Sequence, residues 1–272
     1  MNVLKHIINF YLNASIHVAL AATALVLMTY YFANLPVDNI VVLLVFFGTI
    51  STYNFMKYAS VVIKNNEVGT KTKMVIILST LSFMGAVFCF LKLRWHAQFT
   101  TILFGFLCIL YVIPIAKEKK NLRNLAGVKI YIVSFCWAGI TTIIPIINAD
   151  IPIETDLIYK FVQRFVLTLI LILIFEINDL KYDDIRLKTV PQTIGIQNTK
   201  NFIYALLIPF YLLEFLKHTY YPNQWLINLI LVSVIFLFTY FASANRSKYY
   251  TLFWVESVPI LWYVLILVFK QI

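Results

Sequence analysis

The residues best suited to chemistry lie between positions 176 and 195, at the end of a long apolar run. Asp179 and Asp183 are four residues apart there. If the preceding helix continues through both, their Cβ atoms lie about 5 to 6 Å apart on one face, close enough to hold one divalent cation. Arg186 and Lys188 follow directly, so a metal ion and an anion could meet here. The competing interpretation is an ordinary solvated helix end.

The composition indicates what kind of structure positions these residues. Hydrophobic residues make up 61% of the chain and charged residues 12%, whereas soluble domains carry roughly 25% charged residues. Apolar runs of about 20 residues match the roughly 30 Å hydrocarbon core of a bilayer when they are helical. The sequence therefore predicts an all-α integral membrane bundle of about nine transmembrane helices, a single domain over residues 1–272. The expected spans are 13–33, 39–63, 74–91, 96–116, 126–148, 157–178, 201–216, 225–244 and 251–269.

The charged segments between the spans predict the orientation of the bundle. Most of the 22 Lys and Arg residues fall on one side, and this bias marks the cytoplasmic side. We therefore expect a cytoplasmic N-terminus, a C-terminus on the opposite side, and a site that faces the cytoplasm. Asn54, Lys57 and the basic run 117–123 lie on the same side as the 176–195 segment. The topology explains the net charge of +10, and nucleic-acid binding is not expected because no soluble basic domain or arm is present.

Several segments resemble the UbiA superfamily of intramembrane prenyltransferases, over nearly the whole length of the chain. The family's second aspartate motif, DxxxD followed by Thr, a turn and Gly, is matched by Asp179, Asp183, Thr189, Pro191 and Gly195, with one residue fewer before the Thr. The segments 110–114 and 134–139, with the basic run and Lys129 between them, resemble the family's connection between the fourth and fifth helices. The resemblance implies nine helices and transfer of a prenyl chain from an allylic polyprenyl diphosphate to an aromatic or other lipid-precursor acceptor.

The first aspartate motif of the family is only partly present. The family has Asn followed by two acids at four-residue intervals, but here Tyr58 and Val62 follow Asn54. Neither residue can bind Mg²⁺ as a carboxylate does. We therefore expect one Mg²⁺, rather than the family's two, with Asp179, Asp183 and Asn54 as ligands.

A departing diphosphate requires fixed positive charge. The candidate residues for this role are Lys57, Lys117, Lys129, Arg186 and Lys188, with Tyr111 as a hydrogen-bond donor. Lys57 shares a helical face with Asn54 and could replace part of the charge of a missing metal. The basic run could instead contact anionic lipid headgroups. Glu176 could join the metal site or pair with a neighbouring cation.

Other polar residues inside the apolar runs have less specific roles. Glu256 lies within the last span and needs a partner or a function, with Arg246 as the nearest candidate partner. Lys160 and Arg164 are expected to extend toward the headgroups, and Glu214 to reach the interface. The three cysteines are expected to be small buried apolar residues. The four histidines show no metal-binding spacing.

Two main functions follow from these patterns. The first is a UbiA-like prenyltransferase, in which no general base for the acceptor can be named. The second is a catalytically degenerate protein of the same fold, which binds an isoprenoid, a quinone or a membrane partner without turnover. A secondary transporter would need an internal repeat and broken helices, and no clear repeat is visible. No feature points to a particular protein partner.

Overall fold

A computed structural model describes residues 2–64, 69–112, 127–184, 187–219 and 221–270. The structure is 84% helical, and the described residues contain no β-strand. Seven of the described helices are long and apolar enough to cross a membrane, and the bent pair α1 and α2 forms an eighth candidate span. The chain is therefore an all-helical, multi-pass membrane protein, as its composition predicts.

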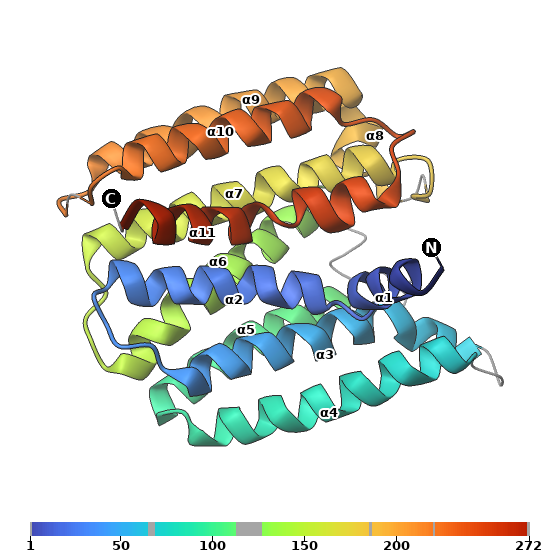
Figure 1. The fold of residues 1–272 in the computed structure, drawn as a ribbon, viewed down its shortest axis with the longest axis horizontal. Helices are drawn as coiled ribbons and strands as arrows, with labels where there is room; N and C mark the ends of the chain where they lie inside the picture. Colours follow the sequence, from blue (N-terminus) through green and yellow to red (C-terminus); the bar gives the residue numbers. More distant parts are fainter. Residues whose placement is uncertain (1, 65–68, 113–126, 185–186, 220, 271–272) are drawn as a thin grey trace.

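The long helices run back and forth between two ends of one bundle (Figure 1). Their bounds are α1 (Asn2–Asn13), α2 (Ile16–Phe32), α3 (Asn39–Lys64), α4 (Thr70–Lys92), α5 (Trp95–Val112), α6 (Val128–Ala149), α7 (Thr155–Asp179), α8 (Val190–Ile194), α9 (Ile196–Leu212), α10 (Gln224–Phe241) and α11 (Val258–Lys270). A 3₁₀ turn, η3 (Leu213–Leu216), follows α9, and a π-helical turn, η4 (Tyr250–Val255), precedes α11. The apolar part of α5, Trp95–Ile109, is shorter than the seven candidate spans.

The two ends of the bundle differ in their charged residues. The aspartate end contains Asp179 and Asp183, together with α1, α8 and the start of η4. The lysine end contains Lys160 and Lys217, together with the end of α2 and the start of α10. The chain begins at the aspartate end, and α11 finishes at the lysine end (Figure 1).

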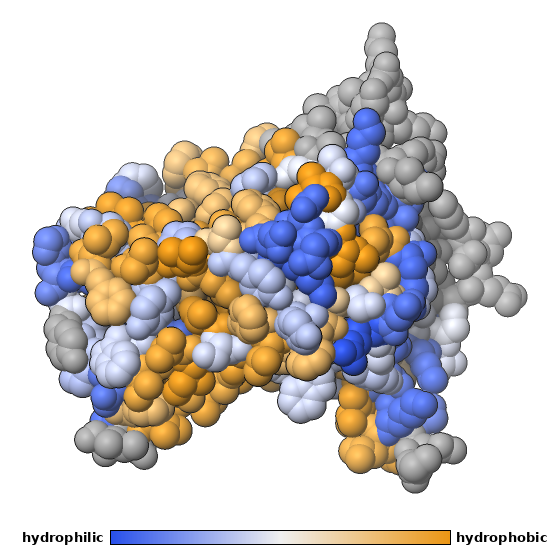
Figure 2. All heavy atoms as spheres, turned by 90° about the horizontal axis from the view of Figure 1, so that it is seen from above, coloured by the Kyte–Doolittle hydropathy of each residue, from blue (hydrophilic) through white to orange (hydrophobic). Residues whose placement is uncertain are grey.

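Helix α7 lies at the centre of the bundle and reaches both ends. Of its apolar stretch 67% is buried, the largest share among the described spans, whereas for α4 the share is 22%. Leu167, Ile170 and Ile174 of α7 are completely buried in the main apolar core. Figure 2 shows hydrophobic residues over the middle of one face of the molecule and hydrophilic residues toward its ends. The charged residues near the two ends of α7 therefore lie at opposite ends of an apolar core.

The first span begins earlier than expected and is broken. Helices α1 and α2 meet at an angle of 56°, and Ser15 between them has a left-handed backbone conformation with φ 59°. This conformation costs a residue other than glycine about 1 to 2 kcal/mol. Ser15 is fully buried, so hydrogen bonds from neighbouring helices must stabilise the break.

The last span also departs from a regular α-helix. At the end of η4 the Glu256 amide donates to the Thr251 carbonyl at 3.0 Å. The acceptor lies five residues earlier, where an α-helix would use the residue four earlier. Such turns widen a helix locally and occur often at functional sites. The break in the first span and the π turn η4 of the last span lie at the same end of the bundle, near α1 (Figure 1).

Candidate functional site

The two predicted acids lie together at the end of α7. The helix finishes at Asp179 and does not continue through Asp183, but the Asp183 amide still donates to the Asp179 carbonyl at 3.0 Å. This bond has the spacing of a helical turn, so the two residues remain one turn apart. Their carboxylates interact electrostatically, and both side chains are partly exposed. The expected proximity of the acids is therefore confirmed, although a turn and not a continuous helix produces it.

Lys129 joins the acids from the first turn of α6. Its Nζ lies 2.7 Å from Oε1 of Glu176, and these side chains are only 12% and 6% exposed. Lys129 also interacts electrostatically with Asp179. Of the two roles considered for Glu176, the structure shows the ion pair. Lys129 is thus placed beside the acids, with much of its charge balanced by Glu176.

The segment after the acids folds back onto α7. The other oxygen of Glu176, Oε2, accepts a hydrogen bond from the Val190 amide at 3.0 Å. The Thr189 amide donates to the Gln192 side chain at 3.0 Å, which caps the start of α8. Lys188 has φ 46° and is exposed just before this cap. Glu176 therefore stabilises both the Lys129 side chain and the start of α8.

Asn54 holds the break between α1 and α2. Its Oδ1 accepts a hydrogen bond from Ser15 Oγ at 2.8 Å, and its Nδ2 donates to the Ala14 carbonyl at 3.0 Å. Asn54 is 2% exposed, so both polar atoms of its amide are used inside the protein. The oxygen expected to bind a metal thus accepts a hydrogen bond from Ser15, and Asn54 has a structural role in this conformation.

Lys57 belongs to the same group of contacts. Although the residue as a whole is exposed, its Nζ turns inward and donates to Ser15 Oγ at 2.9 Å. Ser15 Oγ therefore accepts from Lys57 and donates to Asn54. Lys57 also interacts electrostatically with Glu256. The partner suggested for Glu256 was wrong, because Arg246 instead donates to the Phe241 carbonyl and lies over aromatic rings.

His17 links the break in the first span to the π turn, a contact that the sequence did not indicate. Its Nε2 lies 3.0 Å from both the Phe253 carbonyl and Ser257 Oγ, and its Nδ1 lies 2.7 Å from Tyr11 Oη. A carbonyl can only accept, so Nε2 donates to Phe253, and in the neutral imidazole Nδ1 then accepts from Tyr11. The only sequence signal was the presence of Ser15 and His17 inside an apolar run.

The π turn η4 lies between the two groups of predicted residues. Asn178, next to Asp179, donates from Nδ2 to Thr251 Oγ1 at 3.4 Å. On the other side, Glu256 follows η4 and faces Lys57. Asp179, Asp183 and Lys129 thus form one group and Asn54 and Lys57 another. Asn178, beside the first group, contacts η4, and Glu256, just after η4, interacts with Lys57 of the second. The two groups share one end of the bundle but have different partners.

Some predicted residues cannot be placed in either group. Lys117 and Arg186 lie outside the described residues, as does the side chain of Tyr111. Cys89 and Cys136 are buried, as expected, and Cys108 is partly buried.

Two residues of α7 contradict the expectation drawn from their positions. Lys160 and Arg164 are 2% and 1% exposed, so they do not extend toward lipid headgroups. Lys160 instead pairs with Glu214 at 3.2 Å. Glu214 was expected at the interface, and that expectation is also wrong because its side chain is 8% exposed.

The acids at the aspartate end form a pair and not a larger cluster. The described residues contain no group of three or more His, Cys, Asp or Glu that could hold a metal. Asp179 and Asp183 are two neighbouring carboxylates, whereas Glu176 pairs with Lys129 and Asn54 with Ser15. Mg²⁺ commonly takes one or two carboxylates and keeps water or substrate phosphates as its other ligands. Two partly exposed carboxylates are compatible with that pattern.

Comparisons with known proteins do not add an assignment to this geometry. No family model, curated protein or solved structure matches this chain.

Proposed function

We propose that the chain is an intramembrane prenyltransferase of the UbiA type, with nine spans. In this proposal it transfers a prenyl chain from an allylic polyprenyl diphosphate to an aromatic or other lipid-precursor acceptor. The observation that carries the proposal is the pair Asp179 and Asp183, one turn apart and partly open, with Lys129 beside them. An acid pair next to a lysine at the end of an apolar bundle suits a charged headgroup attached to an apolar tail.

Asp179 and Asp183 would hold one Mg²⁺, which would supply positive charge to the diphosphate. Lys129 would add charge from the α6 side, reduced by its pairing with Glu176. The other proposed diphosphate ligands are Lys57, Lys117, Arg186, Lys188 and Tyr111. Asn54 would not need to reach the metal, since water can complete the coordination.

The reaction would need little covalent chemistry from the protein. The bond between the allylic carbon and diphosphate breaks, a bond to the acceptor carbon forms, and the acceptor proton passes to released diphosphate or water. The apolar helices would exclude water from the allylic cation, and aromatic faces stabilise such a cation by about 1 to 2 kcal/mol. With the positive-inside bias of the loops, the site would face the cytoplasm.

A second candidate function is a protein of the same fold that binds an isoprenoid or quinone lipid without turnover. The observation that favours it is the use of the Asn54 amide by Ser15 and Ala14. The position where the family begins its first metal motif then serves the break between α1 and α2. A transporter is a weaker candidate, supported by that broken span alone.

The test is release of diphosphate from labelled geranyl, farnesyl and longer diphosphates by the purified full-length protein. Reactions contain an acceptor panel and are run with and without Mg²⁺. The prenyltransferase proposal predicts acceptor-dependent release that requires Mg²⁺ and falls at least about 100-fold in Asp179→Asn and Asp183→Asn. Asp184→Asn, an exposed neighbour, should retain activity.

The two candidate functions give different results in this assay. Saturable binding of a prenyl diphosphate or a quinone without release would favour the second. Activity that survives the double substitution Asp179→Asn with Asp183→Asn would refute the site. Lys57→Met tests whether Lys57 replaces a metal charge: unchanged diphosphate affinity at low Mg²⁺ would show that it does not.

A further inference from the structure

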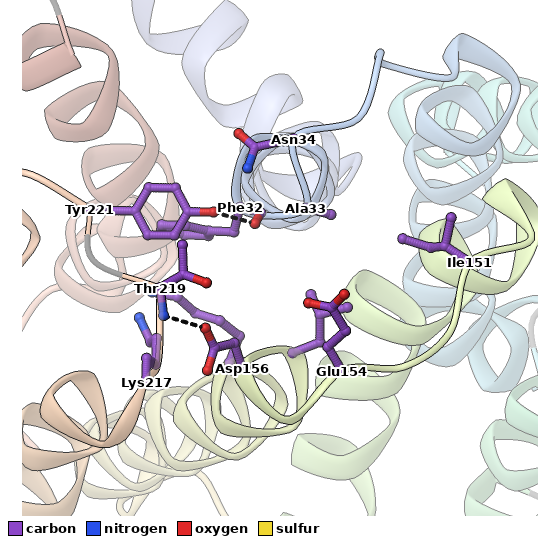
Figure 3. Close-up of a pocket in the computed structure, with 11 residues that line it drawn as sticks. Phe32, Ala33, Asn34, Ile151, Glu154, Asp156, Lys217, Thr219 and Tyr221 are labelled. Atoms are coloured by element: carbon purple, nitrogen blue, oxygen red, sulfur yellow. Dashed lines mark hydrogen bonds between the residues drawn. The ribbon is translucent and has the colours of Figure 1, made fainter.

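A pocket of about 210 Å³ opens at the lysine end, far along α7 from the two acids. It lies between the end of α2, the start of α7 and the connection from η3 to α10 (Figure 3). Tyr221 closes one side, where its hydroxyl donates to the Phe32 carbonyl at 2.5 Å. The Thr219 amide donates to Asp156 at 2.8 Å on another side. These bonds join three separate segments of the chain around one opening.

Two lysines that line this pocket share a single carboxylate. Lys160 lies 3.2 Å from Oε2 of Glu214 and donates to Gln163 Oε1 at 3.3 Å. Lys217 pairs with Oε1 of the same carboxylate, and the Asn228 amide donates to Oε2 at 2.8 Å. All three ionic side chains are less than 10% exposed. Two buried positive charges therefore face one buried negative charge.

Arg164 lies one turn beyond Lys160 on α7 and increases this imbalance. Its Nη1 donates to Thr29 Oγ1, to the Thr141 carbonyl and to Thr142 Oγ1 at 2.5 to 2.9 Å. No ion pair to its guanidinium is found among the described residues. Its Nε and Nη2 are buried and have no hydrogen-bond partner there either. Among the buried described side chains of this region, Lys160, Lys217 and Arg164 therefore face one carboxylate, that of Glu214.

A tryptophan beside Lys160 also lacks a hydrogen-bond acceptor. Trp262 Nε1 is buried without a hydrogen-bond partner among the described residues, and the Trp262 ring lies 5.5 Å from Lys160 Nζ. Three buried nitrogen atoms of Arg164 and Trp262 thus lack an acceptor close to Lys160, although neither residue lines the pocket itself. Buried donors are normally paired, so this part of the protein is short of oxygen atoms as well as of negative charge.

Two acids at the opening offset part of this charge. Glu154 is exposed to solvent, where salt and water screen its charge. Asp156 is partly buried, accepts hydrogen bonds from the backbone amides of His218 and Thr219 at 2.9 and 2.8 Å, and attracts Lys217. The three described cations therefore exceed Glu214 and Asp156 by one charge. Figure 3 shows both acids on the α7 side of the opening. The pocket therefore has acids at its rim and cations at its floor.

We propose that this pocket binds a phosphate group, held by Lys160 and Lys217, with Arg164 as a third cation behind them. Phosphate supplies negative charge to a floor where the described cations outnumber the partly and fully buried carboxylates, and lysine and arginine are its usual partners. A volume of about 210 Å³ admits a phosphate with a short substituent but no long lipid tail. Because the pocket lies at the end of an apolar bundle, the phosphate is either free in solution or part of a lipid headgroup.

The first experiment uses the full-length protein in a nonionic detergent. Inorganic phosphate and sodium chloride are titrated at equal ionic strength while the thermal unfolding midpoint is recorded. A ligand that binds only the folded state raises the midpoint in a saturable way, and we expect this for phosphate and not for chloride. Lys160→Met and Lys217→Met should each weaken the apparent affinity about tenfold or more. Arg94→Gln is the matched control, since Arg94 is an exposed cation at the same end and pairs with Asp150 at 2.5 Å.

The second experiment identifies the source of the phosphate. The wild type and Lys217→Met are placed in nanodiscs of phosphatidylglycerol or of a galactolipid without phosphorus, and bound lipid is weighed by native mass spectrometry. Retained phosphatidylglycerol that inorganic phosphate does not displace indicates a headgroup, and displacement indicates free phosphate. Either result must be weaker in Lys217→Met, which also serves if Lys160→Met does not fold. The proposal is overturned if neither source gives saturable binding, or if Arg94→Gln loses as much as Lys217→Met.

Discussion

The two ends of α7 differ in the charged residues that they hold. At the lysine end, Lys160, Lys217 and Arg164 are buried, and among the described residues their counter-charges are the buried Glu214 and the partly buried Asp156. At the aspartate end, Lys129 and Glu176 balance one another, and the two aspartates next to them repel each other. Buried cations favour an anion, and a pair of carboxylates favours a cation. In the functions proposed above, one helix would therefore serve two ligand sites of opposite charge, separated by an apolar core.

The largest effect is expected at Glu214, because its removal leaves two buried ammonium groups without a carboxylate. Breaking a buried ion pair in this way costs about 3 to 5 kcal/mol. Glu214→Gln should lower the free energy of unfolding by that amount, measured by denaturant titration in detergent. Glu154→Gln, at the exposed rim, should stay within about 0.5 kcal/mol of wild type. A small effect at Glu214 would show that one lysine is neutral and that the lysine end has no cationic excess.

The ion pair of Lys129 with Glu176 should contribute less to stability than Glu214 does. Removing Glu176 leaves one ammonium group without its carboxylate, whereas removing Glu214 leaves two. Glu176→Gln is expected to lower the free energy of unfolding by about 1.5 to 3 kcal/mol, the range for a hydrogen bond to a charged group. Lys129→Met with Glu176→Gln should recover part of this loss, since no unpaired charge remains. A double-mutant cycle measures the coupling. Additive effects would mean that the pair does not stabilise this end.

The break in the first span gives an intermediate effect. Ser15→Ala removes the hydroxyl that joins Lys57 and Asn54 and should lower the free energy of unfolding by about 1 to 2 kcal/mol. Ser15→Gly also removes it but relieves the left-handed strain at φ 59°, so its loss should be about 1 kcal/mol smaller. Thermal unfolding of both variants side by side measures this difference. The reverse order would indicate that the backbone there is unstrained.

The smallest effect on stability is expected at the two aspartates. Asp179→Asn and Asp183→Asn should change the free energy of unfolding by no more than about 0.5 kcal/mol, because both side chains are partly exposed. What should disappear is the rise in unfolding temperature caused by MgCl₂, which Asp184→Asn should keep. A magnesium response that survives both substitutions would show that the cation binds elsewhere and that the aspartate end is not a cation site.

The sequence predicted the elements better than it predicted the contacts between them. The apolar runs located the long helices, and the spacing of Asp179 and Asp183 predicted their proximity. A span's length follows from hydropathy, whereas the direction of a polar residue on it depends on neighbours that are distant in the chain. Lys160 illustrates this, because its partner Glu214 is 54 residues away. In the sequence alone, Lys160 and Glu214 looked like separate interfacial residues.

Asn54 shows why the candidate site was only partly predictable. Its place in a family-like pattern suggested a metal ligand, but its hydrogen-bond partners depend on the break at Ser15. The run 13–33 looked like an uninterrupted helix because it contains no proline or glycine. The break is stabilised by long-range bonds from α3, which local propensity does not encode. His17 was missed for the same reason, as its partners lie on η4.

The π turn before Glu256 has a consequence for how changes in chain length would act. A π turn, in which an amide bonds to the carbonyl five residues earlier, contains one residue more than an α-helical turn. Deleting one residue between Tyr250 and Val255 would restore regular α-helical winding, because the wide turn takes up the extra residue without rotating the helix beyond it. Glu256 and Ser257 would then keep nearly the same directions toward Lys57 and His17. A deletion in the regular part of α11 would instead rotate everything beyond it by about 100°, so the π turn is the part of the last span that best accommodates a change of one residue.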